Sequence, residues 1–252
     1  MFDLFGYHTF FDSKHGTWHT EIEADGRVMP IEEFSELDGV SFGSYFDIYG
    51  CAALKKLPSN MKVGKDCWIK VCPGLTEIPH GLQVGRNLHF DRCVGIKTVS
   101  SRITVGQSVY FCDCTGLTEF TEAPVIGDSL YFNGCLNLRN LPTHLTVPGN
   151  LGLKYCKELT EFPKEMIVKG HIFLDECVGL SKYCVDVNRH GKLFYGVPMR
   201  DGPHVVIDCL NFTEDEVFDY LNKNRRYYRS DCFKLAKEAI KLANSFLAKE
   251  VK

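Results

Sequence analysis

Cysteine recurs every 21 residues through the middle of this chain, and that period constrains the fold more than any other feature. The seven cysteines in register are Cys51, Cys72, Cys93, Cys114, Cys135, Cys156 and Cys177. Hydrophobic residues also occupy fixed places in the period, nine, five and three positions before each cysteine and three and six positions after it. A single unit of this length cannot bury its own apolar residues, so stacked units must bury them against one another.

The hydrophobic residues five and three positions before each cysteine alternate as in a β-strand, so both side chains should face inward. Three corners are expected in each coil. Glycines mark the first, where we expect them to permit a positive φ: Gly43, Gly64, Gly85, Gly106, Gly127, then Gly149 and Gly170 one place later. Prolines mark the second: Pro58, Pro79, Pro142 and Pro163. Glycines mark the third: Gly74, Gly95, Gly116 and Gly179.

These patterns predict a repeat β-solenoid of the leucine-rich-repeat-like kind, with parallel strands and about seven coils over residues 39–185. The ladder cysteines are expected to be small, buried, structural residues. The 12 cysteines include no C-x-x-C pair and no common zinc spacing. We therefore expect neither a metal site nor disulfides, and the lack of a recognisable signal peptide favours a reducing, cytoplasmic location.

The stretch from Leu75 to Cys93 reads L-T-E-I-P-H-G-L-Q-V-G-R-N-L-H-F-D-R-C. It resembles the short leucine-rich-repeat-like units of bacterial and bacteriophage proteins, and the resemblance extends from about Gly39 to Tyr183. More distantly, the repeat is similar to those of secreted bacterial effectors that carry ubiquitin-ligase tails, but nothing here resembles their catalytic tail. The resemblance implies the fold and suggests a bacterial or phage factor that acts on a host or defence protein.

The two ends of the chain depart from the period. Residues 1–38 are rich in aromatic side chains and are expected to cap the first coil, with a hairpin from Trp18 to Pro30 around Asp25 and Gly26. Residues 186–252 are expected to form a small α+β module that ends in two helices. Strands are predicted at 192–197 and 205–210. A capping box at Thr213 to Glu216 starts the first helix, and Ser230 can cap the second, which runs to about residue 249.

The second helix carries an apolar stripe that is either core or a partner-binding face, and we favour core. Residues 221–252 hold nine basic and three acidic residues, although the whole chain has a net charge of −3. Arg225, Arg226 and Arg229 lie together in this basic region beside two tyrosines. They could attract nucleic acid, but we favour a solvated linker because the rest of the chain is acidic.

Two columns of the repeat should point outward from the parallel sheet, four and two positions before each cysteine. The first contains Trp68, His89, Tyr110, Tyr131 and Phe173, and we expect the first four to stack as an aromatic ladder. The second contains Lys70, Asp91, Asn133, Lys154 and Asp175, together with Cys112. Such a ladder can stabilise the sheet, form a recognition surface, or do both. We favour recognition, because the side chains of the outward columns differ in chemistry from coil to coil whereas those of the inward columns stay apolar.

No phosphate-binding, dinucleotide-binding, hydrolase or zinc-protease motif occurs, so no catalytic residue, metal or cofactor is expected. No apolar stretch is long enough to span a membrane. We therefore expect a non-enzymatic scaffold that binds a protein through the outward face of the sheet. The alternatives are a small-molecule or carbohydrate binder that uses the aromatic ladder, and a targeting arm for an activity in the C-terminal module. The oligomeric state cannot be inferred.

Overall fold

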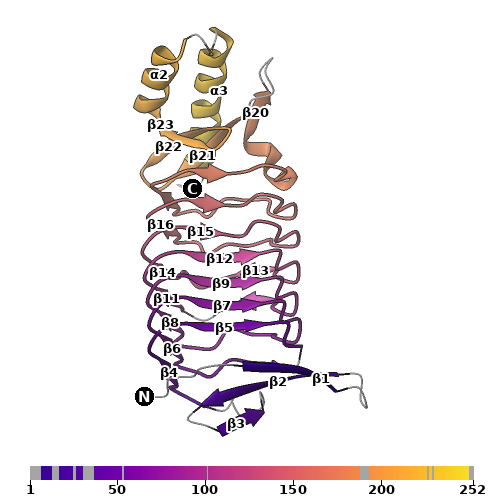
Figure 1. Cartoon of the computed structure of the whole chain (residues 1–252). Helices are drawn as coiled ribbons and strands as arrows, with labels where there is room; N and C mark the ends of the chain where they lie inside the picture. Colours follow the sequence, from indigo (N-terminus) through magenta and orange to yellow (C-terminus); the bar gives the residue numbers. More distant parts are fainter. Residues whose placement is uncertain are drawn as a thin grey trace.

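The computed structural model describes residues 7–12, 17–24, 27–30, 37–52, 54–100, 102–187, 193–225, 227–228 and 230–249. Side chains are described from residue 37 onward, apart from those of residues 186, 187 and 230. The repeated segment forms a stack of coils, with one strand of a long parallel sheet contributed by each repeat (Figure 1). The predicted repeat β-solenoid is therefore confirmed.

The long sheet has seven strands in the order β19-β17-β15-β12-β9-β7-β5. Its strands are β5 (Phe46–Tyr49), β7 (Cys67–Lys70), β9 (Leu88–Asp91), β12 (Val109–Cys112), β15 (Leu130–Tyr131), β17 (Leu151–Gly152) and β19 (Ile172–Phe173). Neighbouring strands pair in parallel at an offset of 21 residues, as Val109 does with Leu88. The sequence period and the structural repeat are therefore the same.

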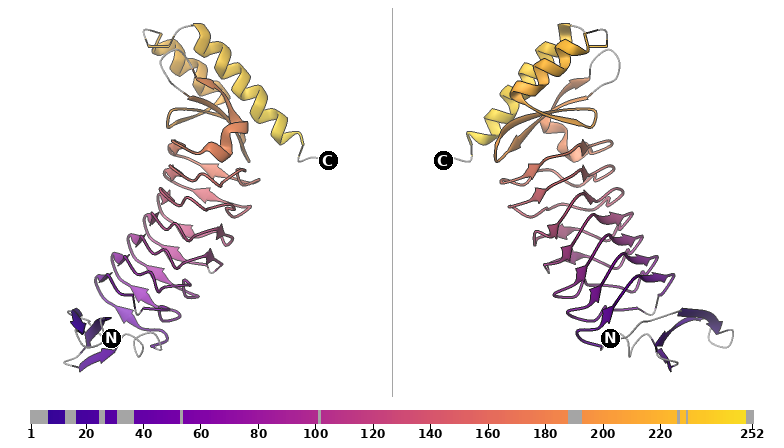
Figure 2. Two further views of the ribbon diagram at one scale, coloured as in Figure 1. Left: turned by 90° about the vertical axis from the view of Figure 1, so that its right-hand side faces the viewer. Right: turned by 60° about the vertical axis from the view of Figure 1, so that its left-hand side comes forward.

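Shorter ladders form the other sides of the coil (Figures 1 and 2). The glycine corner follows a five-stranded sheet of β4 (Ser41–Phe42), β6 (Lys62–Val63), β8 (Gln83–Val84), β11 (Thr104–Val105) and β14 (Val125–Ile126). Beyond it, β16 (Thr146–Val147) pairs only with β18 (Ile167–Val168). The break falls where the glycine moves by one place. A third side carries β10 (Thr98–Val99) and β13 (Glu119–Phe120).

The interior is a set of ladders of like side chains. The rings of Phe90 and Phe111 stack at a centroid distance of 5.3 Å, and those of Phe111 and Phe132 stack at 5.6 Å. All seven ladder cysteines are buried. Each strand of the long sheet therefore contributes its predicted inward pair to one continuous core.

The thiols of the ladder are bonded as well as buried. Cys114 donates to the carbonyl oxygen of Phe90 at 3.0 Å, and Cys135 donates to that of Phe111 at 2.9 Å. Cys93, Cys156 and Cys177 make the same bond, always to a residue 24 positions earlier. All 12 cysteines are free thiols. Burial raises the pKa of Cys114 to about 12, so this thiol is neutral at neutral pH.

The reason predicted for the corner glycines is wrong. In Gly64, Gly85, Gly106 and Gly127, φ is not in the positive region. A Cβ on Gly106 would instead lie 2.1 Å from the carbonyl oxygen of Gly85 in the preceding coil. The third corner follows the same rule, since a Cβ on Gly116 would lie 1.9 Å from the carbonyl oxygen of Val94. Glycine is needed at these corners because successive backbones approach too closely for any side chain.

Positive φ occurs at a different place, immediately before each ladder cysteine. The residues concerned are Gly50, Val71, Arg92, Asp113, Gly134, Tyr155 and Glu176, with φ between 54° and 81°. Only two of the seven are glycine, so the residue types do not reveal this corner. For Val71 the conformation is strained because its Cβ is branched, and the stacked coils must impose it.

The N-terminal region contains an antiparallel sheet of β1 (Tyr7–Asp12), β2 (Thr17–Ala24) and β3 (Arg27–Pro30) at the end of the stack (Figure 1). The pairing of Ala24 with Arg27 confirms the predicted hairpin. The aromatic side chains expected to cap the first coil lie outside the described part. The capping role of residues 1–38 therefore stays a prediction.

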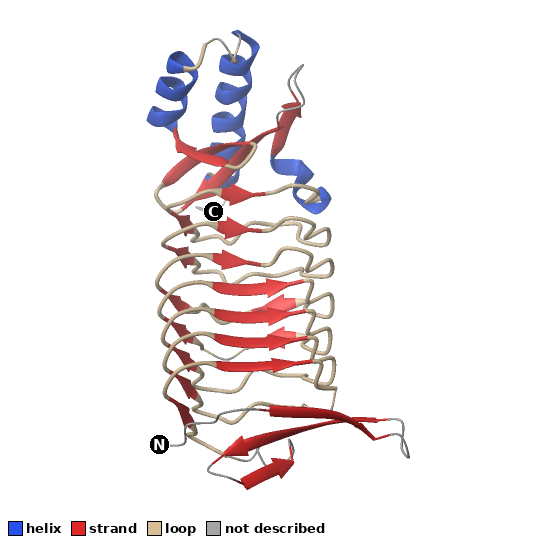
Figure 3. Cartoon of the chain, in the orientation of Figure 1, coloured by secondary structure: helices blue, strands red, loops and turns tan. Residues whose placement is uncertain are grey.

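The C-terminal module contains the helices (Figure 3). After the 3-10 helix η1 (Val178–Tyr183), an antiparallel sheet is formed by β20 (Cys184–Val187), β21 (Leu193–Met199), β22 (Gly202–Ile207) and β23 (Leu210–Thr213). Helices α2 (Glu214–Lys223) and α3 (Ser230–Leu247) follow. Thr213 and Glu216 form the predicted capping box. Strands β21 and β22 were predicted, whereas β20 and β23 were not.

The sheet of this module is covered on both faces. Tyr195, Val197, Met199 and Val206 join the core of the solenoid, whereas Phe194, Val205 and Ile207 pack in a second core with the two helices. The apolar stripe of α3 belongs to this second core, as predicted, through Cys232, Leu235, Ala236, Ala239 and Ile240. The last coil is also bonded to the module, because Ile172 donates its backbone N–H to Cys209 at 3.0 Å.

We expect Gly106→Ala to destabilise the protein by about 1–3 kcal/mol, because the new methyl group must push two coil backbones apart. Urea unfolding followed by circular dichroism measures this loss. Thr104→Ala is the control, since Thr104 is exposed two residues earlier, and it should change stability by less than about 0.5 kcal/mol. Equal stability of the two variants would contradict the close-approach explanation.

We expect stability to fall as the pH rises from about 9 toward 12. A thiol in the unfolded chain ionises near the ordinary cysteine pKa of 9.0, whereas burial holds the pKa of Cys114 at about 12, so the unfolded state loses its proton first. The loss is at most about 1.4 kcal/mol per pH unit for each such thiol. Urea titrations at several pH values should show a shallower decline for Cys114→Ala and an unchanged one for Thr115→Ala. Parallel declines of Cys114→Ala and the wild type would contradict this.

A candidate recognition face on the long sheet

An aromatic ladder runs along the outward face of the long sheet, as predicted. Strand pairing places Trp68 beside His89, His89 beside Tyr110, and Tyr110 beside Tyr131. The rings of His89 and Tyr110 stack at 4.3 Å with an interplanar angle of 4°, and those of Tyr110 and Tyr131 stack at 5.0 Å and 9°. Trp68 and His89 are tilted by 31° at 6.0 Å. The column therefore forms one continuous stack.

One end of this stack was not predicted, and the other lies at Tyr131 as predicted. Tyr45 extends it, because its ring stacks on Trp68 at 5.6 Å. Gly152 ends it, because the ring of Tyr131 lies over this glycine, where an added Cβ would be 2.3 Å from a ring carbon. Phe173 is consequently separated from the stack, and Lys154 Nζ lies over its ring, 5.3 Å from the centroid.

The second outward column carries mixed charge beside the rings. Lys70 Nζ lies 5.3 Å from the centroid of Trp68, in the geometry of a cation–π contact. At the other end Lys154 and Asp175 form an ion pair at 2.7 Å. Asn133 bonds to the backbone of the next coil, since its Oδ1 accepts a hydrogen bond from the backbone N–H of Lys154 at 3.1 Å. The structure thus places all ten predicted residues on one face, although Phe173, Lys154 and Asp175 lie apart from the stack.

The electrostatics of this face are governed by partial burial. Desolvation lowers the pKa of His89, and Lys70 lowers it further, while Asp91 acts in the opposite direction. Desolvation also raises the pKa of Asp91. Burial and the neighbouring carboxylates Asp91 and Asp113 raise the pKa of Cys112 to about 11. Cys112 is therefore a thiol at neutral pH, which makes it a poor nucleophile.

A third outward column borders the face and was missed from the sequence. It lies one position after each ladder cysteine, on the turn that follows the strand. Three of its members are apolar and exposed: Val94 at 40%, Leu136 at 39% and Val178 at 60%. The signal was present, because apolar residues recurred at this position without belonging to an inward column. Tyr49, in the second outward column, and Tyr155, immediately before its ladder cysteine, are also exposed.

A polar ladder at the start of the long-sheet strands was also missed. It lies six positions before the ladder cysteines, where each side-chain oxygen accepts a hydrogen bond from the backbone N–H one coil later. Asn87 donates to Asp66 at 3.1 Å, Ser108 to Asn87 at 3.2 Å, and Asn150 to Ser129 at 2.8 Å. The residues Asp66, Asn87, Ser108, Ser129 and Asn150 all hydrogen-bond readily to backbone groups, which was the available signal. This ladder fixes the strands on which the rings stand.

The structure supports few other sites. No group of His, Cys, Asp and Glu residues in the described part could hold a metal ion. Nor do its helices include one that is long and apolar enough to cross a membrane. In the basic region Arg225 bonds to Asn222 Oδ1 at 2.8 Å and lies 5.9 Å from the ring centroid of Phe233. Arg226 and Arg229 lie outside the described residues. No known protein family, curated protein or solved structure matches the chain.

We expect the pKa of His89 to lie below the ordinary histidine value of 6.5 and to respond to its two charged neighbours. Lys70→Met should raise this pKa, because it removes a positive charge, and Asp91→Asn should lower it further. Because folding disfavours the imidazolium, protonation of His89 should destabilise the protein as the pH falls below about 6.5. An NMR titration of the His89 ring measures the shift. Lys62→Met, on the glycine side of the coil, is the control, and an upward shift there would contradict the local origin.

Proposed function

We propose that this protein is a non-enzymatic scaffold that binds another protein through the outward face of the long sheet. The contact surface consists of the aromatic stack, the mixed-charge column beside it and the exposed apolar turn residues along its border. From the resemblance of its repeat to bacterial and bacteriophage units, we further propose that it acts in the cytoplasm, that of the host if it is phage-encoded, on a host or defence protein.

The observation that carries this proposal is the way the rings are stacked. With centroid distances of 4.3 and 5.0 Å and nearly parallel planes, the inner rings cover each other's faces. Sugar rings and bases are recognised by stacking on free aromatic faces. The inner rings present edges and polar tips, which suit the mixed apolar and hydrogen-bonding surface of a protein. The stack geometry thus favours a protein over a carbohydrate or nucleotide.

The charge on the face supports the same choice. Lys70 and Asp91 stand on neighbouring strands beside the rings, and neither forms an ion pair with the other in the described structure. Both side chains are half-buried. Charges around an aromatic centre are typical of interfaces in which the rim sets the orientation of the partner. The C-terminal module supports the scaffold in this proposal, because both faces of its sheet are already packed.

The test compares two double variants of the full chain. Trp68→Ala/Tyr110→Ala removes two rings from the stack, whereas Lys62→Ala/Gln83→Ala changes exposed residues on the glycine side of the coil. We expect affinity purification from the native host to recover a partner with the wild type and the control variant but not with the ring variant. Binding to the purified partner should then weaken at least tenfold for the ring variant.

The ring variant must be shown to fold before its binding is interpreted. Loss of stacking costs roughly 0.5–1.5 kcal/mol per pair, so its circular dichroism spectrum should be unchanged and its thermal midpoint modestly lower. A second variant, Lys70→Glu/Asp91→Lys, reverses both charges and leaves the rings in place. If both variants retain the partner at wild-type affinity, this face is not the interface.

A further inference from the structure

The third side of the solenoid is open between two coils. Backbone bonds join three successive coils on this side: Thr118 donates to Lys97 at 2.8 Å, and Arg139 donates to Thr118 at 2.8 Å. In the described structure, residues 97–99 make no such bond to the coil before them, so the ladder begins at Lys97. At the next step the pattern stops. None of the backbone N–H groups of residues 160–162 donates to the preceding coil in the described structure, and bonding resumes where Glu165 donates to Thr143 at 2.9 Å.

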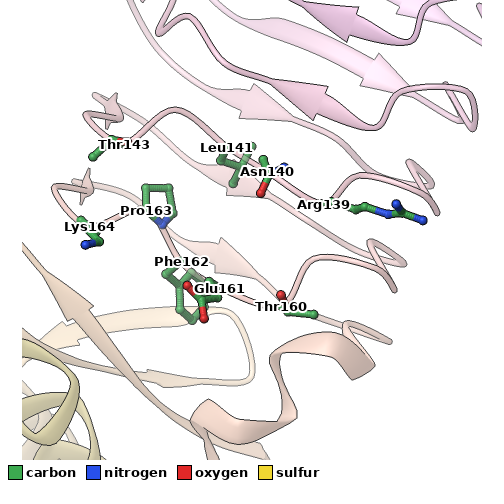
Figure 4. A pocket seen from close by; sticks show the side chains of 9 residues that line it. All are labelled: Arg139, Asn140, Leu141, Thr143, Thr160, Glu161, Phe162, Pro163 and Lys164. Carbon is green, nitrogen blue, oxygen red and sulfur yellow. The ribbon is translucent and has the colours of Figure 1, made fainter. Parts of the chain in front are cut away.

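The open stretch forms a pocket of about 250 Å³ (Figure 4). It is lined by Arg139, Asn140, Leu141, Thr143, Thr160, Glu161, Phe162, Pro163 and Lys164. Leu141, half-buried, and Phe162, buried, supply the apolar part of the lining, and the larger part is polar. Pockets for cofactors and similar ligands usually measure about 300–1,000 Å³. This smaller space suits a few side chains on a segment of polypeptide.

The charges around the pocket are unevenly paired. Glu161 is neutralised by Lys182 at 2.9 Å, and Glu165 just beyond it bonds to His144 at 2.9 Å. Arg139 and Lys164 pair with no acidic side chain in the described part of the chain. The pocket therefore carries two uncompensated positive charges, which would attract a negatively charged ligand.

The two cations lie at opposite ends of the pocket (Figure 4). Residues 139–143 in extended form span roughly 13 Å, so a small anion reaches only one of them. A chain with several carboxylates reaches both. The unpaired backbone N–H groups of residues 160–162 add hydrogen-bond donors of the kind that an extended peptide uses when it aligns with a strand edge.

We propose that this inter-coil slot, lined by the nine residues above, binds a short, extended, acidic peptide segment of a partner. Arg139 and Lys164 would bind carboxylates at its two ends, Leu141 between them would contact an aliphatic side-chain stem, and the backbone N–H groups of residues 160–162 would donate to the peptide backbone. The site is on a different side of the coil from the recognition face and does not depend on it.

The test uses fluorescein-labelled octaglutamate as the probe and fluorescence anisotropy as the measurement, at low salt with the full chain. The variant Arg139→Gln/Lys164→Gln removes both cations of the slot. The control Lys62→Gln/Lys157→Gln removes the same charge from exposed positions elsewhere. We expect the slot variant to weaken binding at least tenfold and the control to change it by less than twofold.

A steric variant separates the slot from general charge attraction. Thr160→Trp places a large side chain in the slot with both cations kept, and it should also weaken binding at least tenfold. Thr76→Trp is its control at the equivalent position of another coil. Trp68→Ala/Tyr110→Ala should bind octaglutamate like the wild type, so failure of this site and failure of the recognition face give different results.

Three results would overturn the proposal. The first is no measurable binding of octaglutamate. The second is an equal loss in the slot variant and the charge-matched control, or full binding by Thr160→Trp, because either shows attraction without a site. The third is complete displacement of the peptide by inorganic phosphate at low millimolar concentration, which indicates a site for a single anion.

Discussion

The structure depends on one constraint: equivalent atoms of successive coils must lie one strand spacing apart, about 4.8 Å. At that distance every repeating group has its partner in the neighbouring coil. The thiol of Cys135 bonds to the carbonyl oxygen of Phe111, and Asn87 Oδ1 accepts from the backbone of Ser108. Glycine at the corners is a consequence of the same spacing, because the backbones leave no room for a side chain.

The same spacing determines what the outward face offers to a ligand. Aromatic rings held one coil apart stack on each other, so their faces are occupied before any partner arrives. The face then consists of ring edges, the charges of the second column and the apolar turn residues. This composition is the basis of the proposal that the face binds a folded protein and not a flat small molecule. Where backbone bonds between coils are missing, between residues 139–143 and 160–164, the third side instead has a pocket.

The inward and outward columns could be predicted because they depend only on position in the period. The seven strands of the long sheet, the buried cysteines and the stack from Trp68 to Tyr131 follow from this rule. The capping box at Thr213 could be predicted because its four residues act locally. The turns were harder. The corner glycines were expected to provide a positive φ, whereas the close approach of neighbouring coils is what requires them. No residue type marks the positive-φ corner at Val71 and Tyr155.

Features that arise between segments could not be predicted. Strands β20 and β23 are only four residues long, too short for alternation to identify them, and they form because β21 and β22 offer them edges. The slot depends on the absence of backbone bonds between two segments whose sequences resemble those of the other coils. Tyr45 joins the aromatic stack from a position that is polar in later repeats, so its column did not identify it.

The cysteine bonds give the solenoid a modular length. The thiols of Cys93, Cys114, Cys135, Cys156 and Cys177 each donate to the carbonyl oxygen 24 positions earlier. This acceptor has the equivalent position in every preceding coil. Removal or duplication of a whole coil therefore leaves every thiol with an equivalent acceptor. Insertion or deletion of a single residue instead shifts the thiols that follow it away from their acceptors. Such a chain can lengthen or shorten its outward face in whole coils while the two ends keep their own contacts.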